Sequence, residues 1–136
     1  MKQINLLILT YCLLVCTIAM AKTFPEGLIL PGERVGNITA ETSEADLIRD
    51  FGKQNLEHKL INLGEGETQE ATVLYPNDPR IMLQIFWLDY DSRKNPTMIR
   101  IIGSQSIWKT RQGIGLGSSL KEIEEHNEAP FSSRWL

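Results

Sequence analysis

The chain has 136 residues, of which 42% are hydrophobic, and its formal net charge is −3 at pH 7. This length suits one domain with one hydrophobic core. Its basic residues form no cluster or stripe, which argues against nucleic acid as a partner, and the weak acidity argues against binding to an anionic membrane surface.

The first 21 residues have the composition of a signal peptide. Lys2 supplies the positive end, an apolar run covers residues 6–18, and Ala19-Met20-Ala21 provides the small residues at which a signal peptidase cleaves. We therefore expect cleavage before Lys22, a secreted or periplasmic product, and no membrane association after cleavage. Retention as an anchor is the alternative, because a helix that spans a bilayer needs about 20 apolar residues.

Both cysteines, Cys12 and Cys16, lie inside this leader. A lipoprotein has a small residue directly before its lipidated cysteine, whereas Val15 precedes Cys16, which argues against lipidation at Cys16. The remaining chain contains no cysteine, so disulfides, cysteine nucleophiles and thiolate metal sites are excluded from it.

The chain after the leader begins with an extended lead-in over residues 22–36, which contain prolines and glycines without a periodic pattern. A short helix is predicted next. Thr42 or Ser43 caps it, acidic residues fill its first turn, and Gly52 ends it. The apolar residues predicted to face the core are Leu47, Ile48 and Phe51.

Four strands are predicted at residues 59–63, 71–75, 81–88 and 98–102. The third of these runs is apolar at nearly every position, which predicts a central strand covered on both faces. The connections are short and carry glycine, proline and acidic turn residues, and such connections join antiparallel neighbours. We therefore predict an antiparallel meander packed against helix.

A second short helix is predicted over residues 118–125, with serine caps and with Leu120 and Ile123 as its apolar positions. The predicted fold class is α+β, with an antiparallel β-meander of about four strands packed with two short helices. Residues 37–103 form the helix and four-stranded unit, and residues 104–136 form a second helical unit.

A shift of 76 residues lays the second helix on the first. Ile38 then falls on Ile114, Ser43 on Ser119, and further matches follow along the helix. One interpretation is a truncated tandem repeat, whose second unit is incomplete and stops at Leu136 before its sheet. The other is a single α+β domain in which two capped helices resemble each other for physical reasons alone.

The segments 42–52 and 113–123 resemble the helix openings of small exported α+β modules, in which a Gly-x-Thr/Ser turn starts a helix that leads into an antiparallel sheet. The β-lactamase-inhibitory-protein-like proteins and the BamE/SmpA-type envelope lipoproteins are such modules. The layout of the chain is also similar to that of secreted proteins of Bacteroidetes-type bacteria. This resemblance covers residues 35–131 and implies binding rather than catalysis.

No catalytic, cofactor or metal site is predicted. The glycine-rich run 113–117 precedes a helix, but it matches neither the dinucleotide nor the Walker pattern. His58 and His126 are the two histidines, and neither has a second metal ligand at a suitable spacing. No serine stands in a Gly-x-Ser-x-Gly elbow.

Three aromatic residues on or beside the strands, Trp87, Tyr90 and Trp108, are the candidate partner-binding residues. Large aromatics usually belong to the core, but Trp87 and Trp108 facing outward would form an anchor patch for another protein. The predicted function is therefore an exported, non-enzymatic binding or structural module without a cofactor. One alternative is a secreted inhibitor that presents residues 64–67 or 89–96 to a hydrolase, and another is a hydrolase with an unrecognised site.

Overall fold

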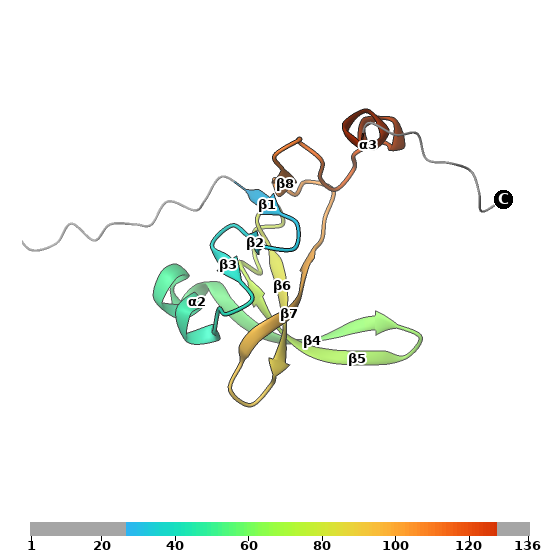
Figure 1. The fold of residues 1–136 in the computed structure, drawn as a ribbon. Coiled ribbons are helices and arrows are strands. Elements are labelled where there is room, and N and C mark those ends of the chain that lie inside the picture. The colour runs from blue at the N-terminus through green and yellow to red at the C-terminus, as the bar shows by residue number, and fades with distance from the viewer. Residues whose placement is uncertain (1–26, 128–136) are drawn as a thin grey trace, which may run out of the picture.

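The computed structural model describes residues 27–127. The predicted leader with Cys16, the cleavage site before Lys22, and the segment after Asn127 lie outside the described residues. The described part contains two α-helices and two sheets whose strand pairs are mostly antiparallel, which is consistent with the predicted α+β class (Figure 1).

The larger sheet is a four-stranded antiparallel meander with the strand order β4-β5-β6-β7. The strands are β4 (Leu56–Gly64), β5 (Glu67–Leu74), β6 (Leu83–Asp89) and β7 (Lys94–Ile101), and they overlap the four predicted runs. β5 pairs with β6 only at residues 72–74. Residues 59–71 therefore extend beyond the four-stranded part as a two-stranded ribbon, here called the arm (Figure 1).

A smaller sheet, which the sequence did not predict, has the strand order β3-β2-β1-β8. Its strands are β1 (Leu28–Leu30), β2 (Arg34–Val35), β3 (Ile38–Thr39) and β8 (Lys109–Thr110). β1 pairs in parallel with β8, which brings residues from the two ends of the described chain together. Within the predicted extended lead-in, residues 28–30 and 34–35 are paired strands joined by a turn. The sequence did not indicate this pairing, because strands of two or three residues leave no periodic pattern.

The first helix, α2 (Glu44–Phe51), confirms the predicted caps. Ser43 is its N-cap and forms a capping box with Asp46, and Gly52 ends it with φ of 87°, a conformation that favours glycine. A short 3₁₀ turn, η1 (Lys53–Asn55), then leads into β4. Leu47 is fully buried, whereas Phe51 is only partly buried.

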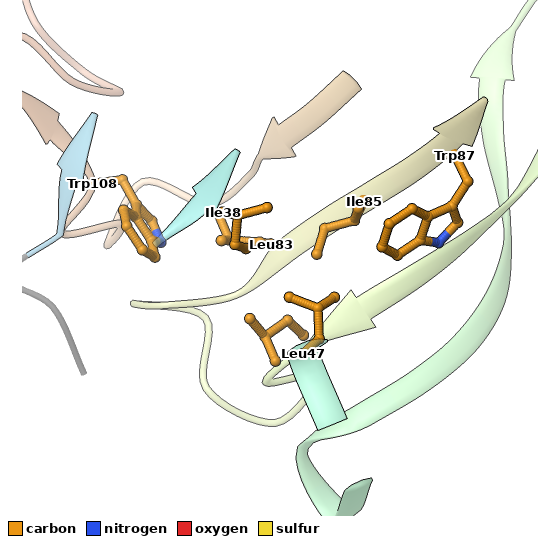
Figure 2. Packing of buried hydrophobic residues seen from close by; sticks show 7 residues of the cluster. Ile38, Leu47, Leu83, Ile85, Trp87 and Trp108 are labelled. Carbon is orange, nitrogen blue, oxygen red and sulfur yellow. The ribbon is translucent and has the colours of Figure 1, made fainter. Parts of the chain in front are cut away.

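The hydrophobic core lies on one face of the larger sheet, between this sheet, α2 and the smaller sheet. Figure 2 shows Trp108 and Trp87 at opposite ends of the buried cluster, with Ile38, Leu83 and Ile85 between them. The opposite face of β5 and β6 is also buried, at Ala71, Val73 and Phe86. The third predicted run is therefore covered on both faces, as expected, up to Trp87.

The second helix, α3 (Leu120–Asn127), begins with the same hydrogen bonds as α2. The four residues of each motif are Thr39, Thr42, Ser43 and Asp46 before α2 and Gly115, Ser118, Ser119 and Glu122 before α3. The Thr39 amide donates to the Thr42 hydroxyl at 3.0 Å, as the Gly115 amide does to the Ser118 hydroxyl at 3.1 Å. The Ser43 amide donates to the Asp46 carboxylate at 3.0 Å, as the Ser119 amide does to the Glu122 carboxylate at 2.6 Å. Capping boxes are a common way for unrelated helices to begin, so the tandem repeat stays a prediction.

Candidate functional site

The three predicted aromatic residues do not form one surface patch. Trp87 is 2% exposed and Trp108 is 1% exposed, and both belong to the core. Their indole N–H groups have acceptors within the chain, since Trp87 donates to the buried Thr72 hydroxyl at 2.9 Å and Trp108 donates to the Ile81 carbonyl at 3.2 Å. Tyr90 is 39% exposed, so it alone of the three is accessible to a partner.

A network of polar side chains surrounds the carboxylate of Glu44, the first residue of α2. Its Oε2 accepts a 2.7 Å hydrogen bond from the hydroxyl of Thr72 and lies 2.8 Å from Nε2 of His58. Because Thr72 also accepts the Trp87 indole hydrogen, one hydroxyl connects the core with this carboxylate. The network joins α2, β4, β5 and β6 at a single point.

Arg93 extends this network to the loop between β6 and β7. Its guanidinium binds Glu70 at 3.0 Å and lies 3.4 Å from the Glu44 carboxylate. The pKa of Arg93 is raised, chiefly by the hydrogen bond to Glu70 and also by the charge of Glu44, while desolvation opposes the shift. The Arg93 carbonyl accepts a 2.9 Å hydrogen bond from the Glu44 amide, so the loop is attached to α2 by backbone as well as side chain.

Residues 89–94, here called the tip, close the β6–β7 hairpin. The Asp89 carboxylate accepts hydrogen bonds from the amides of Asp91 (3.0 Å) and Ser92 (3.2 Å) and from the Ser92 hydroxyl. The hydrogen bonds from Ser92, above all that of its hydroxyl, lower the pKa of Asp89. A side chain that binds the backbone two or three residues ahead fixes the turn conformation.

Two residues at this hairpin, Arg93 and Asn95, have left-handed backbones with φ of 46° and 56°. Asparagine tolerates this region, but for arginine it costs about 1–2 kcal/mol. Such strain persists where the surrounding contacts determine the conformation. Here the Asn95 amide donates to the Thr42 carbonyl at 3.2 Å, next to the bond between Glu44 and Arg93.

The tip and the end of β6 present exposed apolar side chains. Leu88, which precedes the tip, is 72% exposed, and Tyr90 stands within it. The sequence placed Leu88 on a covered face of the central strand, and this placement is wrong. The pairing of β5 with β6 ends at Ile85, so residue 88 lies beyond the four-stranded part of the sheet. Leu88 and Tyr90 thus stand on either side of Asp89 in the chain, where the contacts of Asp89 and Arg93 fix the backbone of the tip.

The Glu44 network was not predicted. Glu44 was assigned only a favourable interaction with the helix dipole, and His58 was assigned no partner. The contacts depend on the pairing of β4 with β5, which places His58 directly opposite Thr72. No group of three or more metal-binding side chains occurs within residues 27–127, and His126 lies exposed in the last turn of α3.

The glycine-rich run 113–117 has a structural role in the described chain. A Cβ atom on Gly115 would lie 2.7 Å from the carbonyl oxygen of Trp108, so only glycine permits this close approach. Gly115 also forms an isolated bridge with Lys109, the first residue of β8. The run is therefore a turn that brings Gly115 against the backbone of Trp108 before α3 begins.

A groove of about 320 Å³ lies between the smaller sheet and β7. Most of its lining is apolar, with Leu30, Val35 and Met98 among the residues that form it. Its charged lining residues, Glu33 and Arg34, lie 3.8 Å from each other and offset each other's charge. The groove is thus suited to an apolar group and offers no set of convergent polar side chains.

Comparison of the chain with protein-family models, curated proteins and solved structures finds no match. No helix in the described part is long and apolar enough to cross a bilayer.

Proposed function

We propose that the protein is an exported, non-enzymatic module that binds another protein through the tip, with Leu88 and Tyr90 as its apolar contacts. The observation that carries this proposal is the combination of a fixed backbone with exposed apolar side chains. Tyrosine is enriched among the residues that dominate binding energy at interfaces. A loop that is already ordered loses little entropy on binding, and affinity increases accordingly.

The contacts of Glu44 support binding rather than catalysis. Its carboxylate is largely buried and is engaged by Thr72, His58 and Arg93. A general base must lie within hydrogen-bond reach of a substrate proton. The Glu44 carboxylate instead faces groups of its own chain, and its contacts hold the tip in place.

Site-specific photo-crosslinking tests the proposal. A benzophenone amino acid replaces Tyr90 in the protein expressed by its own cells, and irradiation is followed by mass spectrometry. We expect one predominant protein adduct, and we expect the Leu88→Asp variant to lose it. The matched control carries the same probe at Ile107, which is similarly exposed (44%) but lies away from the tip in the sequence.

Binding of the identified partner then gives the quantitative test. Tyr90→Ala and Leu88→Ala should each weaken the dissociation constant at least about tenfold, which corresponds to about 1.4 kcal/mol. Equal adducts from positions 90 and 107, or affinities unchanged by both substitutions, would contradict a binding role for the tip.

A secreted inhibitor of a hydrolase is the second candidate function. The turn at residues 64–67 closes the arm, which carries it away from the body of the protein (Figure 1). Enzyme inhibitors commonly insert a preorganised loop into an active site. Assays of secreted proteases, glycosidases and β-lactamases with and without the protein test this role, and loss of inhibition in a variant with residues 64–67 replaced would assign it to the arm.

A further inference from the structure

The two edges of the larger sheet differ in their capacity to accept another strand. On β7, Pro96 lacks an amide hydrogen and Lys94 is bridged to Ser43. β4 is nine residues long, contains no proline, and has no neighbour on its outer side among the described residues. Long unprotected edge strands are sites at which another chain adds a strand.

The register of β4 defines which of its backbone groups point outward. The Tyr75 amide donates to the Asn55 carbonyl at 2.7 Å, and the ladder continues from there through residues 56–62. Antiparallel ladders alternate between residues that bond to one neighbour and residues that bond to the other. The amide and carbonyl groups of Leu56, His58 and Leu60 therefore point to the open edge.

Within residues 27–127, no third strand pairs with the arm. An isolated two-stranded hairpin is marginally stable in water, and stable sheets usually have three or more strands. Leu60, in the middle of β4, is 70% exposed on the arm. Both features leave β4 open to another strand.

We propose that this strand is β4 of a second copy of the chain, paired antiparallel about a two-fold axis through His58. In this register Glu57 lies opposite Lys59 of the second copy, and the same pair occurs again across the axis. Leu56 lies opposite Leu60 of the second copy, also twice. The strand is thus self-complementary in charge and in apolar contacts, as a two-fold interface requires.

The backbone pattern agrees with this register. His58 and its symmetry mate form a hydrogen-bonded pair at the axis, and Leu56 with Leu60 form the next hydrogen-bonded pairs. Glu57 and Lys59 then occupy the non-hydrogen-bonded positions, where side chains approach most closely. A two-fold axis through Leu60 satisfies the backbone equally well, but it places Lys59 opposite Ile61 and Glu57 opposite Leu63, without ion pairs.

Charge reversal tests the dimer and its register. Glu57 and Lys59 pair with each other at 3.0 Å within one chain, so the dimer would bring two such pairs together as a cluster of four alternating charges. Both side chains are half-exposed, so their substitution leaves the core intact. Sedimentation equilibrium should show a dimer for the wild type, and Glu57→Lys and Lys59→Glu should each weaken the dimer dissociation constant at least about tenfold. The double variant and an equimolar mixture of the two single variants should restore the dimer, whereas the control Lys121→Glu should leave it unchanged.

Cross-linking gives a second measurement. In a background with Cys12→Ser and Cys16→Ser, a chain carrying Glu57→Cys is mixed with a chain carrying Lys59→Cys. We expect a mixed disulfide under mild oxidation, and none when Lys59→Cys is replaced by the exposed control Lys53→Cys. A wild type that is monomeric at all concentrations, or a dimer that resists both charge reversals, would overturn the proposal. A monomer that instead binds an extended peptide along β4 would assign the edge to a different protein.

Discussion

The indole N–H of Trp87 donates a 2.9 Å hydrogen bond to the hydroxyl of Thr72, and both side chains are buried. The same hydroxyl donates to Glu44 at 2.7 Å. One threonine therefore couples the packing of the core to the network that holds the tip.

Replacing Thr72 with valine should destabilise the protein by about 1–3 kcal/mol, because the Trp87 indole would keep a buried donor without an acceptor. Urea denaturation measures the loss. Thr68→Val, on the exposed part of the same strand, should change stability by no more than about 0.5 kcal/mol. A loss at Thr72 no larger than that at Thr68 would show that the hydroxyl does not couple the core to the network.

Asp89→Ala should release the tip, since the carboxylate accepts the hydrogen bonds that fix it. Backbone order parameters at residues 90–92 should fall from about 0.85, typical of rigid backbone, towards 0.6. Asp91→Ala is the matched control, because Asp91 contributes its amide rather than its carboxylate to this turn. Unchanged order parameters in Asp89→Ala would contradict preorganisation by Asp89.

Hydrogen bonds from Ser43, led by that of its hydroxyl, lower the pKa of Asp46 from 3.8 to about 2. A carboxyl with a lowered pKa in the folded state stabilises the fold above its unfolded pKa, and this contribution is lost as the pH falls towards 2. Ser43→Ala should therefore raise the pKa of Asp46 part of the way towards 3.8 in an NMR titration, because the amide of residue 43 and the Arg49 guanidinium continue to donate to it. Ser119→Ala should leave Asp46 unchanged and raise the pKa of Glu122 only in part, because the Ser119 amide continues to donate to it.

Leu47 of α2 and Ile123 of α3 occupy equivalent positions at the offset of 76 residues, but Leu47 is fully buried and Ile123 only partly. Leu47→Ala should cost about 2–5 kcal/mol, as buried leucine truncations do. Ile123→Ala should cost less than about 1 kcal/mol. Equal losses in thermal or urea denaturation would show that α3 is packed as firmly as α2.

The elements that sequence predicted well are those with local signals. Ser43 and Gly52 determine the ends of α2 through their own conformations, and the apolar runs of β5 and β6 are long enough to be recognised as strands. The smaller sheet had no such signal, because Leu28 pairs with Lys109 and neither strand is longer than three residues.

The site could be predicted only in part for a similar reason. Loop 89–96 was one of the two loops proposed to meet a partner, and Tyr90 is indeed exposed there. Alternation assigned Trp87 to a face of its strand but gave no information on what covers that face. The contacts of Glu44 with His58 and Thr72 join residues far apart in the chain, and no local pattern in a single sequence indicates them.

The parallel pair of β1 with β8 has a consequence for the order of folding. The meander forms from neighbours in the chain, and its hairpins need only short loops to close. Pairing of β1 with β8 must close a loop that contains the entire meander and α2, and such closure is slow because its entropy cost precedes any gain from contacts. Strand β8 should therefore join β1 last, after the meander and the local pairs of β1, β2 and β3 have formed, and Trp108, which directly precedes β8, should report that final step by its fluorescence.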